Sequence, residues 1–279
     1  MALKKYMVRC DMEGVTGVVS YAQVEPGKPE YLEARENFMQ EILALVEGLQ
    51  EAGADEIAIY DEHWFGRNLE LHRLPKGVTG ICGKPPYRED WAGGLDESYA
   101  GLIIHGLHSK ANSGHLLHHT YEPDFANIEI NNVPVGEIGV EAAIAGDCNV
   151  PVLLVVADSA GVDEGRQLLP DVATVATKQS ESEDGAVCLP LCQTTKMIKR
   201  AAGNIVKNPP AVAPLKFSGP VEMIMDFREG PYLEALRRRA AADMTSGNRL
   251  TFQGASVTSL WARYWALKLQ CQKDVAHAC

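Results

Sequence analysis

The chain has 279 residues, of which 46% are hydrophobic and 23% are charged, and its formal net charge is −11. This composition is typical of a soluble globular protein and excludes long disordered stretches, while the acidic balance disfavours nucleic acid as a partner because it repels phosphate backbones. The seven scattered cysteines, the absence of an apolar run of membrane-span length and the polar N-terminus predict a reduced, cytoplasmic protein without membrane contact.

The first half of the chain alternates between apolar strands and amphipathic helices. In the helix that opens at Pro29, apolar residues recur with a period of 3.6, and Gly53 supplies its end. The predicted elements in order are a strand at 4–11, this helix, strands at 55–61 and about 100–106, a β-hairpin over 127–135 with Asn131-Asn132 at its turn, and a helix over 137–146.

The second half continues the alternation and then changes character at a proline-rich linker, 208–214. Before the linker we predict a strand at 151–157, a helix at 162–169, a strand at 172–178 and a helix at 190–207. After it we predict a strand at 219–227, a helix at 231–242, a strand at 249–255 and a helix at 256–270. This order predicts an α/β fold with a mostly parallel sheet flanked by helices over residues 1–207, and a smaller α+β domain over 215–279.

Potential metal ligands follow three of the predicted strands. Asp11 and Glu13 follow the first strand, His63 the second and His108 the third. Open α/β sheets bind ligands at the carboxyl ends of their strands, so we expect these side chains to share one edge. Asp11 and Glu13 are two residues apart, and adjacent carboxylates repel unless a cation lies between them. One zinc ion, or a pair of them, explains this arrangement.

Each of these residues also has an ordinary structural interpretation. Asp11 and Glu13 suit a polar strand exit, His63 a loop position beside Trp64, and His108 a surface position. Glu137 on its own suits the positive end of a helix dipole better than a metal site. The joint placement, and not any single residue, favours the metal interpretation.

Histidines are concentrated in one short segment after the third strand. They cannot all be ligands, because a two-zinc site keeps positions open for water and substrate. His115 and His118 suit loop or supporting positions, and His105 suits packing within its strand. The five histidines of this segment are His105, His108, His115, His118 and His119.

Four motifs together resemble the DppA-type zinc D-aminopeptidases in order and spacing. The resemblance covers most of residues 4–200, continues through PVLL at 151–154 and Lys178-Gln179, and is traceable to the C-terminus. The combined motifs are specific, whereas DMEG alone is not. The motifs are DMEG at 11–14, YDEH at 60–63, GLH at 106–108 and PVGE at 134–137.

The resemblance implies a binuclear zinc centre with two Zn²⁺ per chain. It also implies His119 as the catalytic histidine, with His118 as the alternative if the spacing slips by one residue, and a homodecamer of stacked pentameric rings that admits short peptides. The ligands that it implies are Asp11, which would bridge the ions, Glu13, His63, His108 and Glu137.

The implied reaction is removal of N-terminal amino acids from short peptides, with the preference for D-residues taken from the resemblance alone. Zinc lowers the pKa of bound water towards about 7, and His119 would stabilise the oxyanion, pass a proton to the leaving amine or act as a nucleophile. The alternatives are an L-aminopeptidase or other metal-dependent amidase on the same site, and a non-catalytic peptide-binding protein.

Two further segments each have two possible interpretations. The acidic residues 181–184 either border the pocket and affect substrate charge preference or form a solvated loop. The apolar stripe of the last predicted helix suits core packing, with a subunit interface as the alternative for part of it. The stripe contains Leu260, Tyr264 and Leu267, with Trp261 and Trp265 alongside.

Overall fold

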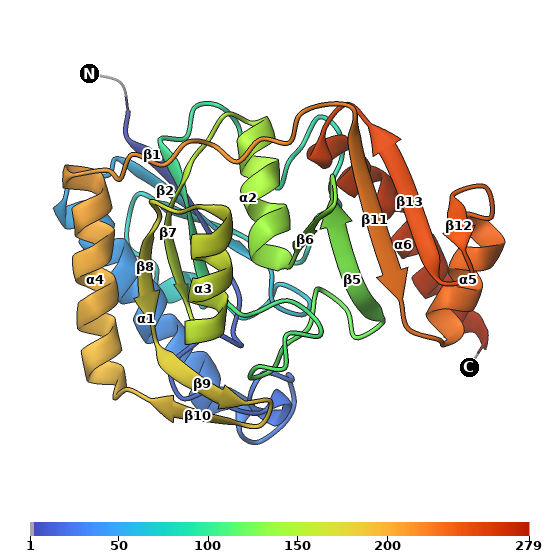
Figure 1. The fold of residues 1–279 in the computed structure, drawn as a ribbon. Helices are drawn as coiled ribbons and strands as arrows, with labels where there is room; N and C mark the ends of the chain where they lie inside the picture. Colours follow the sequence, from blue (N-terminus) through green and yellow to red (C-terminus); the bar gives the residue numbers. More distant parts are fainter. Residues whose placement is uncertain (1–2, 279) are drawn as a thin grey trace.

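A parallel sheet of six strands organises the larger part of the molecule in the computed structural model, which describes residues 3–278 (Figure 1). Its strand order is β3-β2-β1-β4-β7-β8, and the central strands are buried on both faces, as their apolar sequences predict. The strands are β1 (Lys5–Cys10), β2 (Glu56–Asp61), β3 (Val78–Ile81), β4 (Gly101–Leu107), β7 (Val152–Ala157) and β8 (Ala173–Ala176).

Helices cover both faces of this sheet. The pair α1 (Tyr31–Glu51) and α4 (Leu191–Lys207) packs on one face, and the apolar stripe of α1 is buried there as the 3.6-residue period predicts. The pair α2 (Glu137–Asp147) and α3 (Ser159–Leu168) packs on the other face. The predicted α/β class and mostly parallel sheet are therefore confirmed.

A second, antiparallel sheet of five strands lies beside the first, with α2 between the two sheets (Figure 1). Its order is β12-β13-β11-β5-β6, so the predicted hairpin from the first half of the chain pairs with strands from the C-terminal part. The division at residues 1–207 and 215–279 stays a prediction. The elements are β5 (Phe125–Ile130), β6 (Val133–Val135), β11 (Val221–Phe227), β12 (Met244–Ser246), β13 (Arg249–Gly254), α5 (Pro231–Arg239) and α6 (Val257–Ala278).

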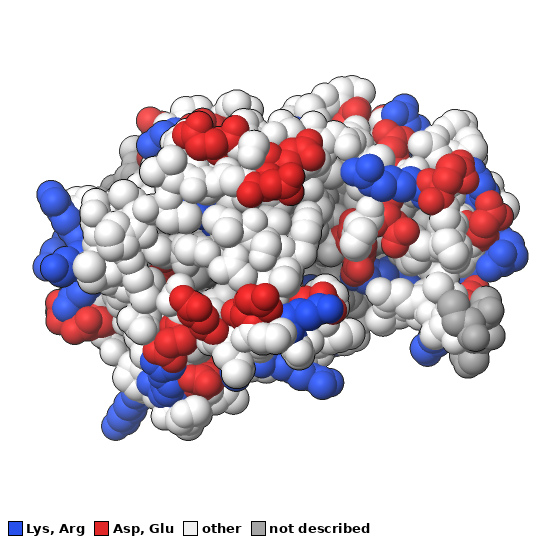
Figure 2. Space-filling model, turned by 90° about the horizontal axis from the view of Figure 1, so that it is seen from below, with Lys and Arg blue, Asp and Glu red and all other residues white. Residues whose placement is uncertain are grey.

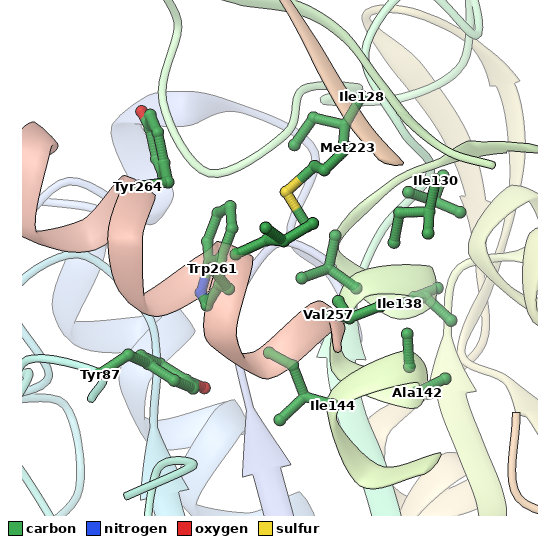
Figure 3. Close-up of a cluster of buried hydrophobic side chains, with 14 of the residues drawn as sticks. Tyr87, Ile128, Ile130, Ile138, Ala142, Ile144, Met223, Val257, Trp261 and Tyr264 are labelled. Atoms are coloured by element: carbon green, nitrogen blue, oxygen red, sulfur yellow. The ribbon is translucent and has the colours of Figure 1, made fainter. Parts of the chain in front are cut away.

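The C-terminal helix closes the core between the two sheets. Trp261 and Tyr264 of α6 are buried against the antiparallel sheet, and Ile138 and Ile144 of α2 line the same cluster (Figure 3). Burial of aromatic rings of this size makes a large contribution to stability, since truncating one to alanine typically costs about 3–5 kcal/mol. The core interpretation of the C-terminal stripe fits this packing.

The structure differs from the predicted elements in several places. The short strands β3 and β12 are not among the predicted elements, and the last helix, predicted at 256–270, continues to Ala278. The strand predicted at 172–178 ends at Ala176, and Lys178 instead opens a separate hairpin of β9 (Lys178–Ser182) and β10 (Gly185–Cys188). The predicted helix at 162–169 begins earlier, because the Asp158 side chain caps it by accepting from the Gly161 amide. The remaining short elements are the 3-10 helices η1 (Tyr21–Gln23) and η2 (Leu71–Arg73).

Two predictions concern features spread along the chain. The six cysteines that the structure describes are free thiols. Over residues 3–278, every helix is too short or too polar to cross a lipid bilayer.

Candidate active site

All five predicted metal ligands meet at the carboxyl edge of the parallel sheet. They are buried, with exposed fractions of 4% or less, and they come from the ends of adjacent strands and from the first turn of α2. Asp11 and Glu13 follow β1, His63 follows β2, His108 follows β4 and Glu137 is the first residue of α2.

Two glycines allow the segments after β1 and β4 to lie in direct contact. Gly106 has a φ of 75°, and a Cβ atom there would lie 2.0 Å from the carbonyl oxygen of Asp11. A Cβ at Gly14 would lie 2.2 Å from the carbonyl oxygen of Leu107, and the Gly14 amide donates to Gly106 at 2.6 Å. Only glycine fits at either position, which explains why DMEG and GLH occur together in the sequence.

The first cluster of ligand atoms joins Asp11, Glu13 and His63. His63 Nδ1 lies 2.6 Å from Asp11 Oδ1 and 3.2 Å from Glu13 Oε2. Its other ring nitrogen, Nε2, lies 2.6 Å from the carbonyl oxygen of Val24. A carbonyl can only accept, so Nε2 carries a hydrogen, and the Nδ1 lone pair can bind a cation between the carboxylates.

The second cluster joins His108, His119 and Glu137. Glu137 Oε1 lies 3.4 Å from His108 Nε2 and 4.0 Å from His119 Nε2. Each histidine donates from Nδ1 to a backbone carbonyl, His108 to Ser109 at 3.0 Å and His119 to Leu117 at 2.9 Å. The two rings stack with centroids 4.1 Å apart. Both Nε2 atoms therefore face the Glu137 carboxylate.

The electrostatics of both clusters require positive charge. Burial alone would raise the pKa of Glu13, but the neighbouring histidines outweigh it and hold that pKa well below its usual range. Burial would lower the pKa of His108, but Glu137 and the carboxylates of the first cluster raise it to about 10. Protons on the histidines thus take the place that a cation would occupy between these carboxylates.

The donor set fits a pair of zinc ions. In each cluster the potential ligand atoms lie within 4.8 Å of one another. Among residues 3–278, Glu13 Oε2 and His108 Nε2 are buried without a hydrogen-bond partner. Buried polar atoms without partners are costly, and imidazole and carboxylate are ligands that zinc prefers.

The other histidines of the segment lie in different surroundings. His118 Nε2 lies 3.4 Å from Glu183 Oε1 of the acidic segment, and His115 is exposed. His105 is wholly buried and lies 3.0 Å from Glu41 Oε2 of α1. Of the five histidines in the segment, His108 and His119 are the two whose rings lie within 4.0 Å of Glu137.

The acidic segment is the end of β9 and the turn of the β9–β10 hairpin. The Leu117 amide donates to the Glu183 carbonyl at 3.4 Å, and the Leu116 amide donates to Ser180 Oγ at 2.9 Å. The Glu183 side chain remains largely exposed. The hairpin therefore holds the backbone of the histidine loop while its carboxylates face solvent, as the solvated-loop interpretation expects.

Sequence reasoning missed Lys178 as a support of the site. This side chain is buried, and its Nζ donates to the carbonyl oxygens of Glu13 at 2.5 Å and Val15 at 2.8 Å. Burial lowers the pKa of Lys178 to about 8. The only signal in the sequence is that Lys178-Gln179 belongs to the family resemblance, because nothing in the spacing connects it with Glu13.

The surface seen from below the view of Figure 1 is mixed in charge. Figure 2 shows acidic side chains gathered in several groups on this face, with basic side chains between them. This distribution agrees with the formal net charge of −11.

Three comparisons with known proteins agree. The sequence model of the peptidase M55 family, described as D-aminopeptidase, matches residues 4–265. A D-aminopeptidase from Bacillus subtilis (strain 168) is 29% identical over 214 residues, which cover 76% of this chain and 77% of that protein. The solved structure of the Zn-dependent D-aminopeptidase DppA from Bacillus subtilis, described as a self-compartmentalizing protease, superposes with a TM-score of 0.89 at 25% identity, over 97% of this chain and 98% of that one.

Proposed function

Because the chain belongs to the peptidase M55 family of D-aminopeptidases, we propose that it removes N-terminal D-amino acids from short peptides at a two-zinc site. The observation that carries the two-zinc proposal is the pair of buried clusters with ligand atoms within 4.8 Å of one another. The residues that would hold the ions are Asp11, Glu13, His63, His108 and Glu137.

The ions, when bound, would activate water and polarise the scissile carbonyl. The chain's own residues fix the tautomer in which each imidazole would bind an ion. The Val24 carbonyl holds the hydrogen of His63 on Nε2, and the Ser109 carbonyl holds that of His108 on Nδ1. Both imidazoles can therefore bind a cation while remaining neutral.

We assign His119 the role of acting on the scissile amide of the substrate. Its Nδ1 is fixed by the Leu117 carbonyl, its Nε2 faces Glu137, and its side chain is 20% exposed, so substrate can reach it. When the peptide C–N bond breaks, the leaving nitrogen needs a proton, and the developing oxyanion needs a hydrogen-bond donor. A protonated His119 Nε2 can supply either.

The proposal also covers the oligomeric assembly of the protein and its location in the cell. The related Bacillus subtilis enzyme is described as a self-compartmentalizing protease. We propose that this chain likewise forms stacked pentameric rings, a homodecamer whose interior admits only short peptides. The free cysteines support a reducing, cytoplasmic location.

Metal analysis and paired substrates test the proposed function. Purified, zinc-reconstituted protein should hold two ions per chain and hydrolyse D-alanine anilide faster than L-alanine anilide. Less than one ion per chain after reconstitution would refute the two-metal site. A clear preference for the L-anilide would favour the L-aminopeptidase alternative, and binding of peptides without turnover by metal-replete protein would favour a peptide-binding protein.

A further inference from the structure

A second group of buried and half-buried polar side chains adjoins the candidate metal site. Its centre is Arg9 of β1, which is 0% exposed. We call the group the Arg9 network, and its members are Arg9, Glu62, Tyr87, Tyr121 and Glu141.

The Arg9 guanidinium contacts three of the other four members of the network directly. Its Nη1 forms an ion pair with Glu141 and donates to the Tyr87 hydroxyl at 2.8 Å, while Nη2 donates to the Ala92 carbonyl at 2.6 Å. The Tyr87 hydroxyl in turn lies 3.2 Å from Glu62 Oε1. Burying a charged arginine is costly unless it is paired, so the fully buried Arg9 depends on the acceptors that its two terminal nitrogens reach. Its Nε is buried without a hydrogen-bond partner in the part of the chain that the structure describes.

The network is connected to the metal site through the chain itself. Arg9 is the second-last residue of β1 and Asp11 follows that strand, while Glu141 lies one helical turn after Glu137 on α2. The pairs of neighbours are Arg9 with Asp11, Glu62 with His63, Tyr121 with His119 and Glu141 with Glu137.

Tyr121 provides the direct contact between the two groups. Its amide donates to Glu137 Oε1 at 2.6 Å, and its hydroxyl donates to Glu141 Oε1 at 2.9 Å. The residue has a φ of 55°, a conformation that non-glycine residues rarely adopt. Its ring lies 4.5 Å from that of Trp261, centroid to centroid. The phenol anchors therefore keep this strained backbone in the one conformation that points the amide at Glu137.

We propose that the Arg9 network is a positioning device for the proposed metal site, and that Tyr121 transmits its effect to Glu137. The inference rests on the proposed two-zinc function. The Tyr121 amide holds Glu137 with Oε1 towards His108 and His119. Arg9 holds Glu141, and Glu141 holds the Tyr121 hydroxyl. None of these three network residues needs to touch substrate.

Tyr121→Phe tests the proposal, with Tyr232→Phe as the matched control. Both substitutions remove one hydroxyl from a side-chain hydrogen bond, which is part-buried for Tyr121 and buried for Tyr232, but the Tyr232 hydroxyl pairs with that of Tyr264 at 2.9 Å, between α5 and α6. We expect Tyr121→Phe to lose zinc to a chelator about 10–100 times faster, since changing a residue that holds a metal ligand in place typically costs that much in metal affinity or activity. The control should release zinc like the parent enzyme.

Two further readouts separate positioning from general loosening. In Tyr121→Phe, kcat should fall while KM for the D-alanine anilide changes less than about twofold, because the lost interaction orients a ligand and binds no substrate. The visible absorption of the cobalt-substituted enzyme should shift in Tyr121→Phe and stay unchanged in Tyr232→Phe. Parent-like zinc release, kcat and cobalt spectrum in a folded Tyr121→Phe enzyme would overturn the proposal.

Arg9→Lys and Glu141→Gln provide the second line of test, also in case Tyr121→Phe does not fold. Lysine keeps the charge of Arg9 but lacks the planar guanidinium, whose two terminal nitrogens reach acceptors on different elements. Arg9→Lys should therefore release zinc faster, and combining it with Glu141→Gln should add less than the sum of the single effects. Additive effects would overturn the proposed route through Glu141. If the parent enzyme itself holds less than one ion per chain after reconstitution, the proposed two-metal site fails. If it holds two and these variants behave like it, only the positioning role fails.

Discussion

Replacing His119 by alanine should remove most turnover while leaving the fold and both ions in place. The side chain is 20% exposed, stacks on His108 at 4.1 Å and donates one hydrogen bond to Leu117. A ring pair contributes about 0.5–1.5 kcal/mol and a neutral hydrogen bond about 1 kcal/mol. The variant should therefore lose roughly 2 kcal/mol against a typical total of about 5–15 kcal/mol, and remain folded.

The catalytic loss should be larger than the loss of stability. Removing one oxyanion donor typically lowers kcat by about 10²–10³, or about 2.7–4 kcal/mol, and general acid catalysis contributes about 10²–10⁴. The assay is hydrolysis of D-alanine anilide with metal content measured on the same sample. His119→Gln keeps a donor but cannot deliver a proton, so partial activity in it would indicate an oxyanion role, and activity as low as that of alanine would indicate proton transfer.

His118→Ala and His115→Ala are the matched controls. His118 pairs with Glu183 and His115 is exposed, so both variants should retain turnover within a few-fold. Unchanged turnover in His119→Ala would refute the catalytic assignment and move it to one of these neighbours. Loss of one ion per chain in His119→Ala would instead make His119 a ligand, as its place beside His108 and Glu137 permits.

Three other predictions follow from the supports of the site. Lys178→Met removes two charge-assisted hydrogen bonds, worth about 1.5–3 kcal/mol each before the relief of a buried charge, and should lower both the unfolding temperature and kcat. The surface variant Lys199→Met should change neither quantity. A Lys178→Met variant with the unfolding temperature and kcat of the parent would contradict the support that we assign to Lys178. Chelation should lower the unfolding temperature by roughly 10 °C for each ion removed, because zinc at a thousand times its Kd contributes about 4 kcal/mol per site and a protein of this size shifts by about 2–4 °C per kcal/mol. An unchanged temperature in metal-free protein would be incompatible with ions between buried carboxylates. Light scattering should give about 304 kDa, ten chains of 30.4 kDa, and a monomer would exclude the proposed rings.

The strand-end placement of the ligands could be predicted from sequence because strand period and strand ends are local properties. Asp11, Glu13, His63 and His108 follow apolar segments whose length and composition identify them as strands. In a parallel sheet, such ends meet at one edge whatever the strand order. Glu137 differs, because an acidic first residue of a helix is common. Its approach to His108 depends on how α2 packs, and only the family resemblance indicated it.

The supports of the site could not be predicted because their partners are distant in sequence. Lys178 reaches the carbonyl of Glu13 across 165 positions, and Arg9 reaches Tyr87 across 78. Neither residue has a local pattern that distinguishes it from a surface cation. The second sheet presents the same difficulty, since the pairing of β5 with β11 joins segments on opposite sides of the proline-rich linker. Long-range pairing is set by packing, which sequence periodicity does not encode.

Charge balance connects the Arg9 network with the need for two ions rather than one. The proposed ligands Asp11, Glu13 and Glu137 contribute three negative charges, and two zinc ions contribute four positive ones. Glu62 and Glu141 add two negative charges next to the site, and Arg9 returns one positive charge. Over these six residues, with Glu62 ionised, the charge is zero with both ions and minus two with one. Burial raises the pKa of Glu62 to about 7, so this count holds above neutral pH. Because uncompensated buried charge is costly, the network should make the second ion bind more tightly than the ligands alone would.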